Sequence, residues 1–105
     1  MMFTEEDFSQ RLSELRIQKG VSAREMSLAI GLNPGYIQNI ESGKAAPSLE
    51  NFLYICEYLK ISPSEFFDIQ NKEPGKLQDI ITELKRLDTA RLETVYAVVK
   101  EFSKK

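Results

Sequence analysis

The sequence has no histidine and a single cysteine, Cys56. Without histidine no Ser/His/Asp triad can form, and one cysteine supports neither an internal disulfide nor a common zinc site. The five glycines are scattered and form no phosphate-binding loop. We therefore expect no enzyme activity, no metal ion and no cofactor, and no small-molecule ligand is evident from the sequence.

Long hydrophobic runs are also absent. No apolar stretch approaches the roughly 20 residues that cross a bilayer. Near the N-terminus, Glu5, Glu6 and Asp7 stand where a signal peptide carries basic residues. These features predict a cytoplasmic protein with no membrane contact. Cys56 lies among apolar neighbours, and we expect a buried thiol there rather than a reactive one.

A surplus of basic residues is missing as well. The chain has 14 lysines and arginines against 16 aspartates and glutamates, a formal net charge of −2. Residues 1–70 alone hold six basic and ten acidic side chains. Domains that bind nucleic acid are usually basic on one face. Any such binding here must therefore come from a local patch.

The most informative segment is residues 22–43. Ser22 opens an S-x-x-E capping box, which starts a helix, and Gly31 ends it. Asn33 is expected to cap a second helix, with Pro34 at its first position. Two short helices joined by a tight turn form the DNA-binding helix-turn-helix. This segment predicts double-stranded DNA as a partner.

Helix caps and apolar spacing predict three more helices around this motif. The expected helices follow Thr4 (ending at Gly20), Ser48 (residues 49–60) and Ser62 (through Phe67). The apolar stripe of the first is expected to contain Phe8, Leu12, Leu15 and Ile17. No strand pattern is present, so the predicted fold is an all-α domain of five helices over residues 1–70.

A polar stretch with a Pro-Gly pair over residues 71–76 predicts a linker. Residues 77–105 then carry apolar residues at helical spacing, which predicts a C-terminal helical segment. Asp88 and Thr89 form a possible cap, which favours two helices over one continuous helix. The single helix stays open as the alternative.

Several motifs in register resemble the phage repressor/Cro-like (XRE) helix-turn-helix family. The resemblance covers about residues 8–70, and its anchors are L-R-I-Q-K-G at 15–20, Gly31, I-Q-N-I-E-S-G-K at 37–44, Pro47 and I-S-P-S-E-F-F at 61–67. It implies a repressor-like fold, DNA binding and transcription regulation. In the family, an arginine late in helix one pairs with a glutamate late in helix three. Those positions hold Arg16 and Glu41, which could otherwise be two unrelated surface charges.

In the family, side chains at the first, second and sixth positions of helix three read base edges. Here these positions hold Pro34, Gly35 and Asn39, and the first two offer no side-chain hydrogen bond. Asn39 can make a bidentate contact to adenine. Gly35 would let the backbone approach the duplex closely. Gln38 and Tyr36 complete the candidate contacts, with Tyr36 meeting a thymine methyl or a phosphate, or lying half-buried.

The candidate phosphate contacts are basic side chains and one hydroxyl that flank the motif. They are Lys19, Ser22, Arg24 and Lys44. The family's phosphate-binding glutamine at the start of helix two is Ala23 in this sequence. Direct recognition is therefore expected to rest on few side chains.

The C-terminal segment offers a means of pairing two copies. Its apolar residues would form a dimer interface, which we assign to Leu84, Leu92, Val95, Val99 and Phe102. The alternative is that these helices fold back onto their own domain. The resulting prediction is a homodimeric DNA-binding regulator that acts as a repressor, because blocking a promoter requires only that the protein occupy it. The competing hypothesis is a protein-interaction module that kept the fold and lost DNA binding.

Overall fold

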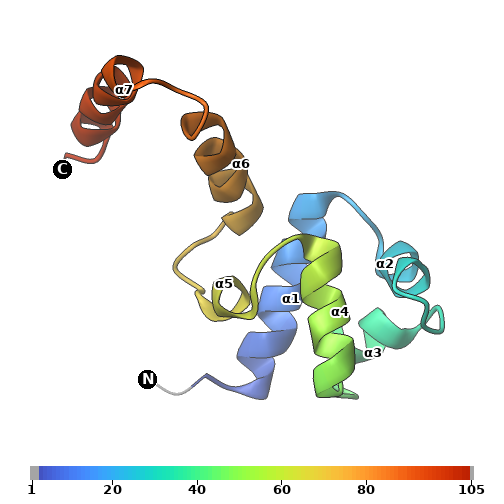
Figure 1. Cartoon of the computed structure of the whole chain (residues 1–105). Coiled ribbons are helices and arrows are strands. Elements are labelled where there is room, and N and C mark those ends of the chain that lie inside the picture. Colours follow the sequence, from blue (N-terminus) through green and yellow to red (C-terminus); the bar gives the residue numbers. More distant parts are fainter. Residues whose placement is uncertain (1–2, 105) are drawn as a thin grey trace. The chain divides into compact units, whose positions relative to one another are not determined.

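The computed structural model describes residues 3–104, so residues 1, 2 and 105 of the predicted domains lie outside it. The described residues form seven α-helices and no strand, which confirms the all-α prediction. The helices are α1 Glu5–Lys19, α2 Ala23–Ala29, α3 Tyr36–Glu41, α4 Leu49–Leu59, α5 Pro63–Phe67, α6 Pro74–Leu84 and α7 Thr89–Phe102 (Figure 1). None of the helices in this part of the chain combines the length and apolarity that a membrane crossing requires.

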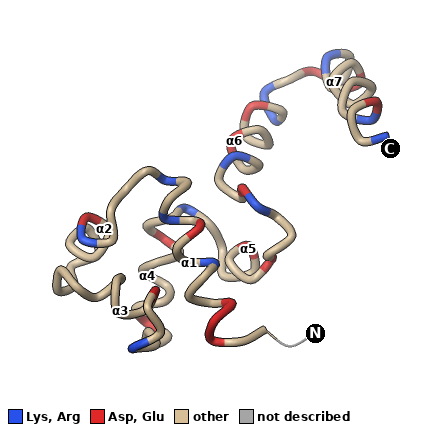
Figure 2. Tube along the Cα trace, turned by 180° about the vertical axis from the view of Figure 1, so that it is seen from behind, with Lys and Arg blue, Asp and Glu red and all other residues tan. Residues whose placement is uncertain are grey.

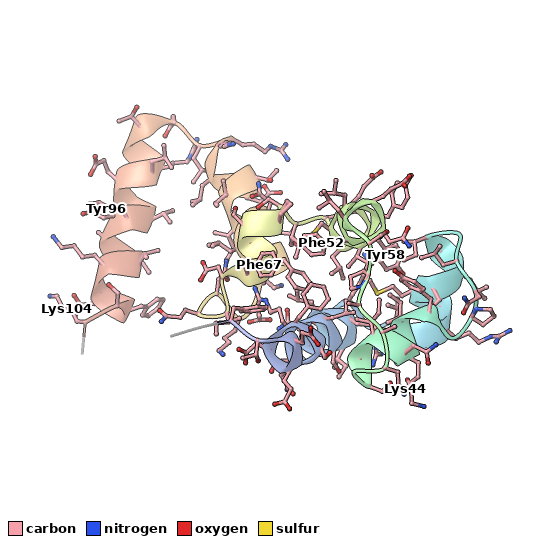
Figure 3. All side chains as sticks on the ribbon, turned by 90° about the horizontal axis from the view of Figure 1, so that it is seen from below. Lys44, Phe52, Tyr58, Phe67, Tyr96 and Lys104 are labelled. Atoms are coloured by element: carbon pink, nitrogen blue, oxygen red, sulfur yellow. The ribbon has the colours of Figure 1, made fainter. Side chains whose placement is uncertain are left out.

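The chain divides into two compact units, the first ending at Gly75 and the second beginning at Lys76. In the first unit, α1 contacts α3, α4 and α5, and α2 packs against α3 (Figure 1). The core between them contains Leu12, Leu15, Met26, Ile37, Ile40, Phe52, Ile55, Cys56, Leu59, Ile61 and Phe66. The Phe52 and Phe67 rings meet at a centroid distance of 5.5 Å (Figure 3).

The caps predicted at Thr4, Ser22, Ser48 and Ser62 are confirmed. Thr4, Ser22 and Ser62 each form a reciprocal capping box with the acidic residue three positions later. The Ser48 hydroxyl accepts the Asn51 N–H at the start of α4. Each cap depends only on residues within one turn, which is why the sequence locates these helix starts.

The start of α3 differs from the prediction. The helix begins at Tyr36, and Pro34 and Gly35 belong to the turn before it. The Asn33 side chain accepts the Gly35 N–H at 3.1 Å, and its carbonyl accepts the Tyr36 N–H at 3.1 Å. Asn33 therefore closes a tight turn instead of capping the helix, because its side chain bonds two residues ahead.

The predicted apolar stripe of α1 is wrong at one position. Ile17 is 63% exposed, whereas Arg11 is only 1% exposed. Phe8, Arg11, Leu12 and Leu15 follow the i, i+3, i+4, i+7 spacing of one helix face. Ile17 lies nine residues after Phe8, about half a turn away from that face at 3.6 residues per turn.

Arg11 is buried because it binds the end of α5. Its guanidinium donates to the carbonyl oxygens of Phe66 at 2.7 Å, Glu65 at 2.8 Å and Asp68 at 3.1 Å. These carbonyls close a short helix that has no following turn to bond them. Burial lowers the pKa of the Arg11 guanidinium, although the nearby Glu14 and Asp68 carboxylates act in the opposite direction.

The second unit contains most of α6 and all of α7. The predicted linker over residues 71–76 is shorter in the structure, because α6 begins at Pro74, where the missing N–H of proline is tolerated. The choice of two helices over one is confirmed: the Asp88 carboxylate accepts the Arg91 N–H at 2.9 Å and starts α7. Among residues 76–104 no side chain is fully buried.

Candidate nucleic-acid interface

The position of α3 on α2 depends on a buried hydroxyl. Ser27 donates to the Ala23 carbonyl at 2.8 Å within α2 and accepts the Ile37 N–H at 3.0 Å from α3. The second bond satisfies one of the helix-start N–H groups that have no partner inside α3. A small side chain at position 27 thus lets the two helices approach closely and also connects them.

The other end of α3 is held against α1 by Arg16 and Glu41. Arg16 donates from Nε to Glu41 Oε2 at 2.6 Å and from its terminal nitrogen to Oε1 at 3.0 Å. It also donates to the Val21 carbonyl at 2.9 Å. The Glu41 hydrogen bond raises the pKa of Arg16. Their side chains are 16% and 9% exposed, so the bidentate pair is largely shielded from water.

The outward face of α3, together with its flanking cap residues Gly35 and Ser42, follows helical spacing. Gly35, Gln38, Asn39 and Ser42 are all exposed at i, i+3, i+4 and i+7, while Ile37 and Ile40 are buried opposite them. Within residues 3–104 the Asn39 side chain forms no hydrogen bond, so its amide can bind an outside group. Ser42 was not among the predicted site residues, although its spacing from Gly35 indicates the same face.

Tyr36 lies at the inner edge of this face. It is half-buried and packs against the core, and its hydroxyl accepts a hydrogen bond from the Asn51 amide at 3.1 Å. Asn51 lies in the first turn of α4 and was not predicted as part of the site. No local pattern indicates this contact, because it joins residues of two different helices.

All three predicted basic side chains are free of ion pairs within the described residues. Arg24 in α2 and Lys44 after α3 are exposed, and neither forms a salt bridge there. Lys44 projects away from the helices in Figure 3. The Lys19 ammonium instead lies over the Tyr58 ring, 4.9 Å from its centroid. Ser22, the fourth predicted phosphate contact, caps α2 with its hydroxyl.

Acidic groups border one side of α3. Gln38 and Ser42 line a hollow together with Glu5 and Glu6 of α1. Figure 2 shows the acids (red) gathered at the start of α1. Their negative charge disfavours a phosphate chain on that side of the helix. The Asn39 side of α3 is electrostatically the more favourable approach for a polyanion.

Cys56 is buried in α4, as its apolar neighbours predicted. Burial raises the pKa of its thiol to about 11. The thiolate fraction at neutral pH is therefore very small, and the thiol serves as a core side chain.

The helix-turn-helix geometry agrees with a comparison against known protein families. A family model described as helix-turn-helix matches residues 12–66, more than half of the chain. The chain belongs to the helix-turn-helix family. The proteins to which the chain is similar also confirm its resemblance to the phage repressor/Cro-like (XRE) type, which the sequence motifs indicated.

Two of these relatives are regulators. The HTH-type transcriptional regulator PuuR of Escherichia coli K12 is 32% identical over 74 residues, which are 70% of this chain and 40% of PuuR. PuuR of Shigella flexneri matches equally well. The chain thus aligns with about 40% of the length of these curated relatives.

A solved structure supports the fold. The crystal structure of the restriction-modification controller protein C.AhdI from Aeromonas hydrophila superposes with a TM-score of 0.56 at 38% sequence identity. The match covers 60% of this chain and 91% of C.AhdI. The repressor-like fold predicted for the helix-turn-helix domain is therefore confirmed.

Proposed function

We propose that this chain is a sequence-specific DNA-binding transcriptional regulator that acts as a homodimer and represses transcription. A helix-turn-helix places the second helix of the motif in the major groove. The observation that carries the proposal is the outward face of α3. There the exposed Asn39 amide, which has no hydrogen bond among residues 3–104, lies on a helix that is held at both ends. The regulators PuuR and C.AhdI, which share this motif, support the same role.

In this proposal the base contacts come from α3. Asn39 reads adenine through its amide, which has the donor and acceptor geometry that adenine requires. Gln38 and Tyr36 contribute further contacts, and Gly35 allows close approach of the backbone. A Cβ at Gly35 would meet only Asn33 Oδ1, at 3.8 Å, so this position is open.

The phosphate contacts are assigned to Arg24 and Lys44, with the Ser22 hydroxyl beside them. Lys19 is the weakest member of the set, because its ammonium already contacts the Tyr58 ring. With two or three contacts per protomer, a dimer neutralises about four to six phosphates. The expected slope of log affinity against log salt is then about −4 to −5.

The second unit is assigned to dimerisation. The apolar positions Leu92, Val95, Val99 and Phe102 of α7 repeat at the alternating three- and four-residue spacing of a helix-pairing seam. Val99 is 53% and Phe102 84% exposed within the single chain. Leu84, half-buried in α6, extends the assigned interface. A second copy placed on a twofold axis covers this stripe with the same stripe.

Fluorescence anisotropy tests the proposal directly. The purified full chain is titrated into labelled duplex from upstream of its own gene, between 50 and 200 mM salt, against scrambled competitor. We expect tight binding that resists the competitor, with the salt slope given above. Repression follows if the bound protein excludes RNA polymerase from a promoter in the same duplex. Absence of binding at 50 mM salt contradicts the proposal.

One observation favours a second candidate function, a protein-interaction module without DNA binding. The acidic side chains Glu5 and Glu6 border α3, and basic groups on a protein partner would complement them. If no duplex binds at low salt, this candidate replaces the first. Cross-linking in cells would then identify the partner.

A further inference from the structure

The hydrogen bond between Tyr36 and Asn51 joins the two helices that flank the loop carrying Lys44. The Asn51 amide nitrogen lies 3.1 Å from the Tyr36 hydroxyl oxygen, and the bond is only partly buried. The bond therefore lies at the boundary between the core and the outward side of α3.

Both partners are held in place by other contacts. The Tyr36 ring packs against the core, and the Asn51 backbone N–H donates to the Ser48 hydroxyl at 3.2 Å. A ring that is packed in this way does not turn outward to lie flat on a thymine methyl. Of the two DNA contacts predicted for Tyr36, the geometry favours the one made by the hydroxyl.

The direction of the hydrogen bond decides what the hydroxyl can still do. A phenol can donate one hydrogen bond and can also accept. Here the amide N–H donates, so the hydroxyl oxygen accepts and its own proton has no partner within the described residues. Phosphate oxygens of DNA are acceptors only, and they match a hydroxyl that has a proton to donate.

We propose that Asn51 is a positioning residue for DNA binding, which orients the Tyr36 hydroxyl so that it donates to a phosphate oxygen. The proposal rests on the DNA-binding function proposed above and adds a neutral contact to the phosphate set. Asn51 itself does not touch the duplex. Its role is to donate a hydrogen bond to the Tyr36 hydroxyl oxygen, which leaves the hydroxyl proton free for the phosphate.

A double-mutant cycle on the full chain tests this role. The variants are Tyr36→Phe, Asn51→Asp and the two combined, and each is titrated with the specific duplex. We expect Tyr36→Phe to weaken binding about five-fold, the effect of one neutral hydrogen bond, with an unchanged salt slope because no charge is lost.

Asn51→Asp keeps a bond to Tyr36 but reverses it, because a carboxylate accepts the hydroxyl proton. We expect Asn51→Asp to weaken DNA binding by a factor about five-fold larger in the wild-type background than in the Tyr36→Phe background, where only the added charge acts. Equal costs in the two backgrounds would overturn the proposal. Unchanged affinity in Tyr36→Phe would also overturn it, since the hydroxyl then touches no DNA.

Thermal unfolding separates this role from a purely structural one. A bond that only holds α3 to α4 lowers the melting temperature of the variants and leaves the affinity of the folded protein unchanged. If Asn51→Asp does not fold, Asn51→Leu replaces it. We expect Asn51→Leu to weaken DNA binding less than the value given for Asn51→Asp, because leucine removes the orienting bond but leaves the Tyr36 hydroxyl proton free. Failure of the unmodified chain to bind any duplex overturns the proposed function itself, whereas lost coupling in a binding-competent protein overturns only this inference.

Discussion

The two units of the chain use apolar residues in opposite ways. The first unit buries a core of large apolar side chains around α1 and α4, with Leu12, Ile37 and Phe66 completely enclosed. The second unit has apolar residues at equally regular spacing but encloses none of its described side chains. Periodicity therefore predicts the helices in both units, but it does not reveal which apolar faces are covered within one chain.

The difference has a physical reason. Two helices of 11 and 14 residues cannot surround a core by themselves, and segments this short rarely bury enough surface to offset the entropy of folding. Five helices crossing at different angles can. We accordingly expect the first unit to be stable on its own contacts and the second to depend on a partner.

The largest expected effect is on the second unit. Val95→Glu together with Val99→Glu places two charges in the proposed interface, where an unpaired buried charge costs several kcal/mol. We expect a folded monomer with much weaker DNA affinity, measured by light scattering and anisotropy. Thr94→Glu with Ala97→Glu adds the same charges off the stripe and should stay dimeric. A dimer that survives the first pair of changes places the interface elsewhere.

The next effect contrasts ion pairs in the two units. Glu41→Gln leaves the shielded Arg16 guanidinium without its carboxylate, and we expect it to lower the free energy of unfolding by about 3 kcal/mol. Glu83→Gln breaks an ion pair with Arg86 that is about three-quarters exposed, and the expected loss is below about 1 kcal/mol. Chemical denaturation measures both. Similar losses would contradict the distinction between the units.

A smaller effect concerns recognition alone. Asn39→Ala should weaken binding to the specific duplex by about 1–3 kcal/mol and reduce discrimination against scrambled DNA. Because the side chain is exposed and unbonded within residues 3–104, stability and dimer mass should not change. Gln70→Ala, another exposed amide in the first unit, is the matched control. Undiminished affinity after Asn39→Ala would show that α3 is docked differently.

The smallest effect is electrostatic. Lys44→Ala should weaken binding to all sequences alike and reduce the salt slope by about 1 per protomer. Lys85→Ala removes the same charge from the second unit and should leave the slope unchanged. Anisotropy at several salt concentrations provides both slopes. A change of slope with Lys85→Ala would mean that the second unit also touches the duplex.

Local chemistry made much of the fold predictable. Thr4, Ser22 and Ser62 locate helix starts because each cap bonds an N–H group within the next turn. The Arg16 and Glu41 positions came from the family resemblance, and the two side chains are in contact in the structure. The start of α3 could not be placed as well, because Asn33 has two ways of bonding the backbone ahead of it.

The sequence by itself determined where the helices lie, the helix-turn-helix motif and the apolar side of most helices, because these depend on bonds and spacings within a few residues. Only the tertiary structure decided that Arg11 is buried and Ile17 exposed, and that Asn51 binds Tyr36. Arg11 finds its acceptors more than 50 residues away at the end of α5. Such contacts exist only after the helices have packed, so no local pattern records them.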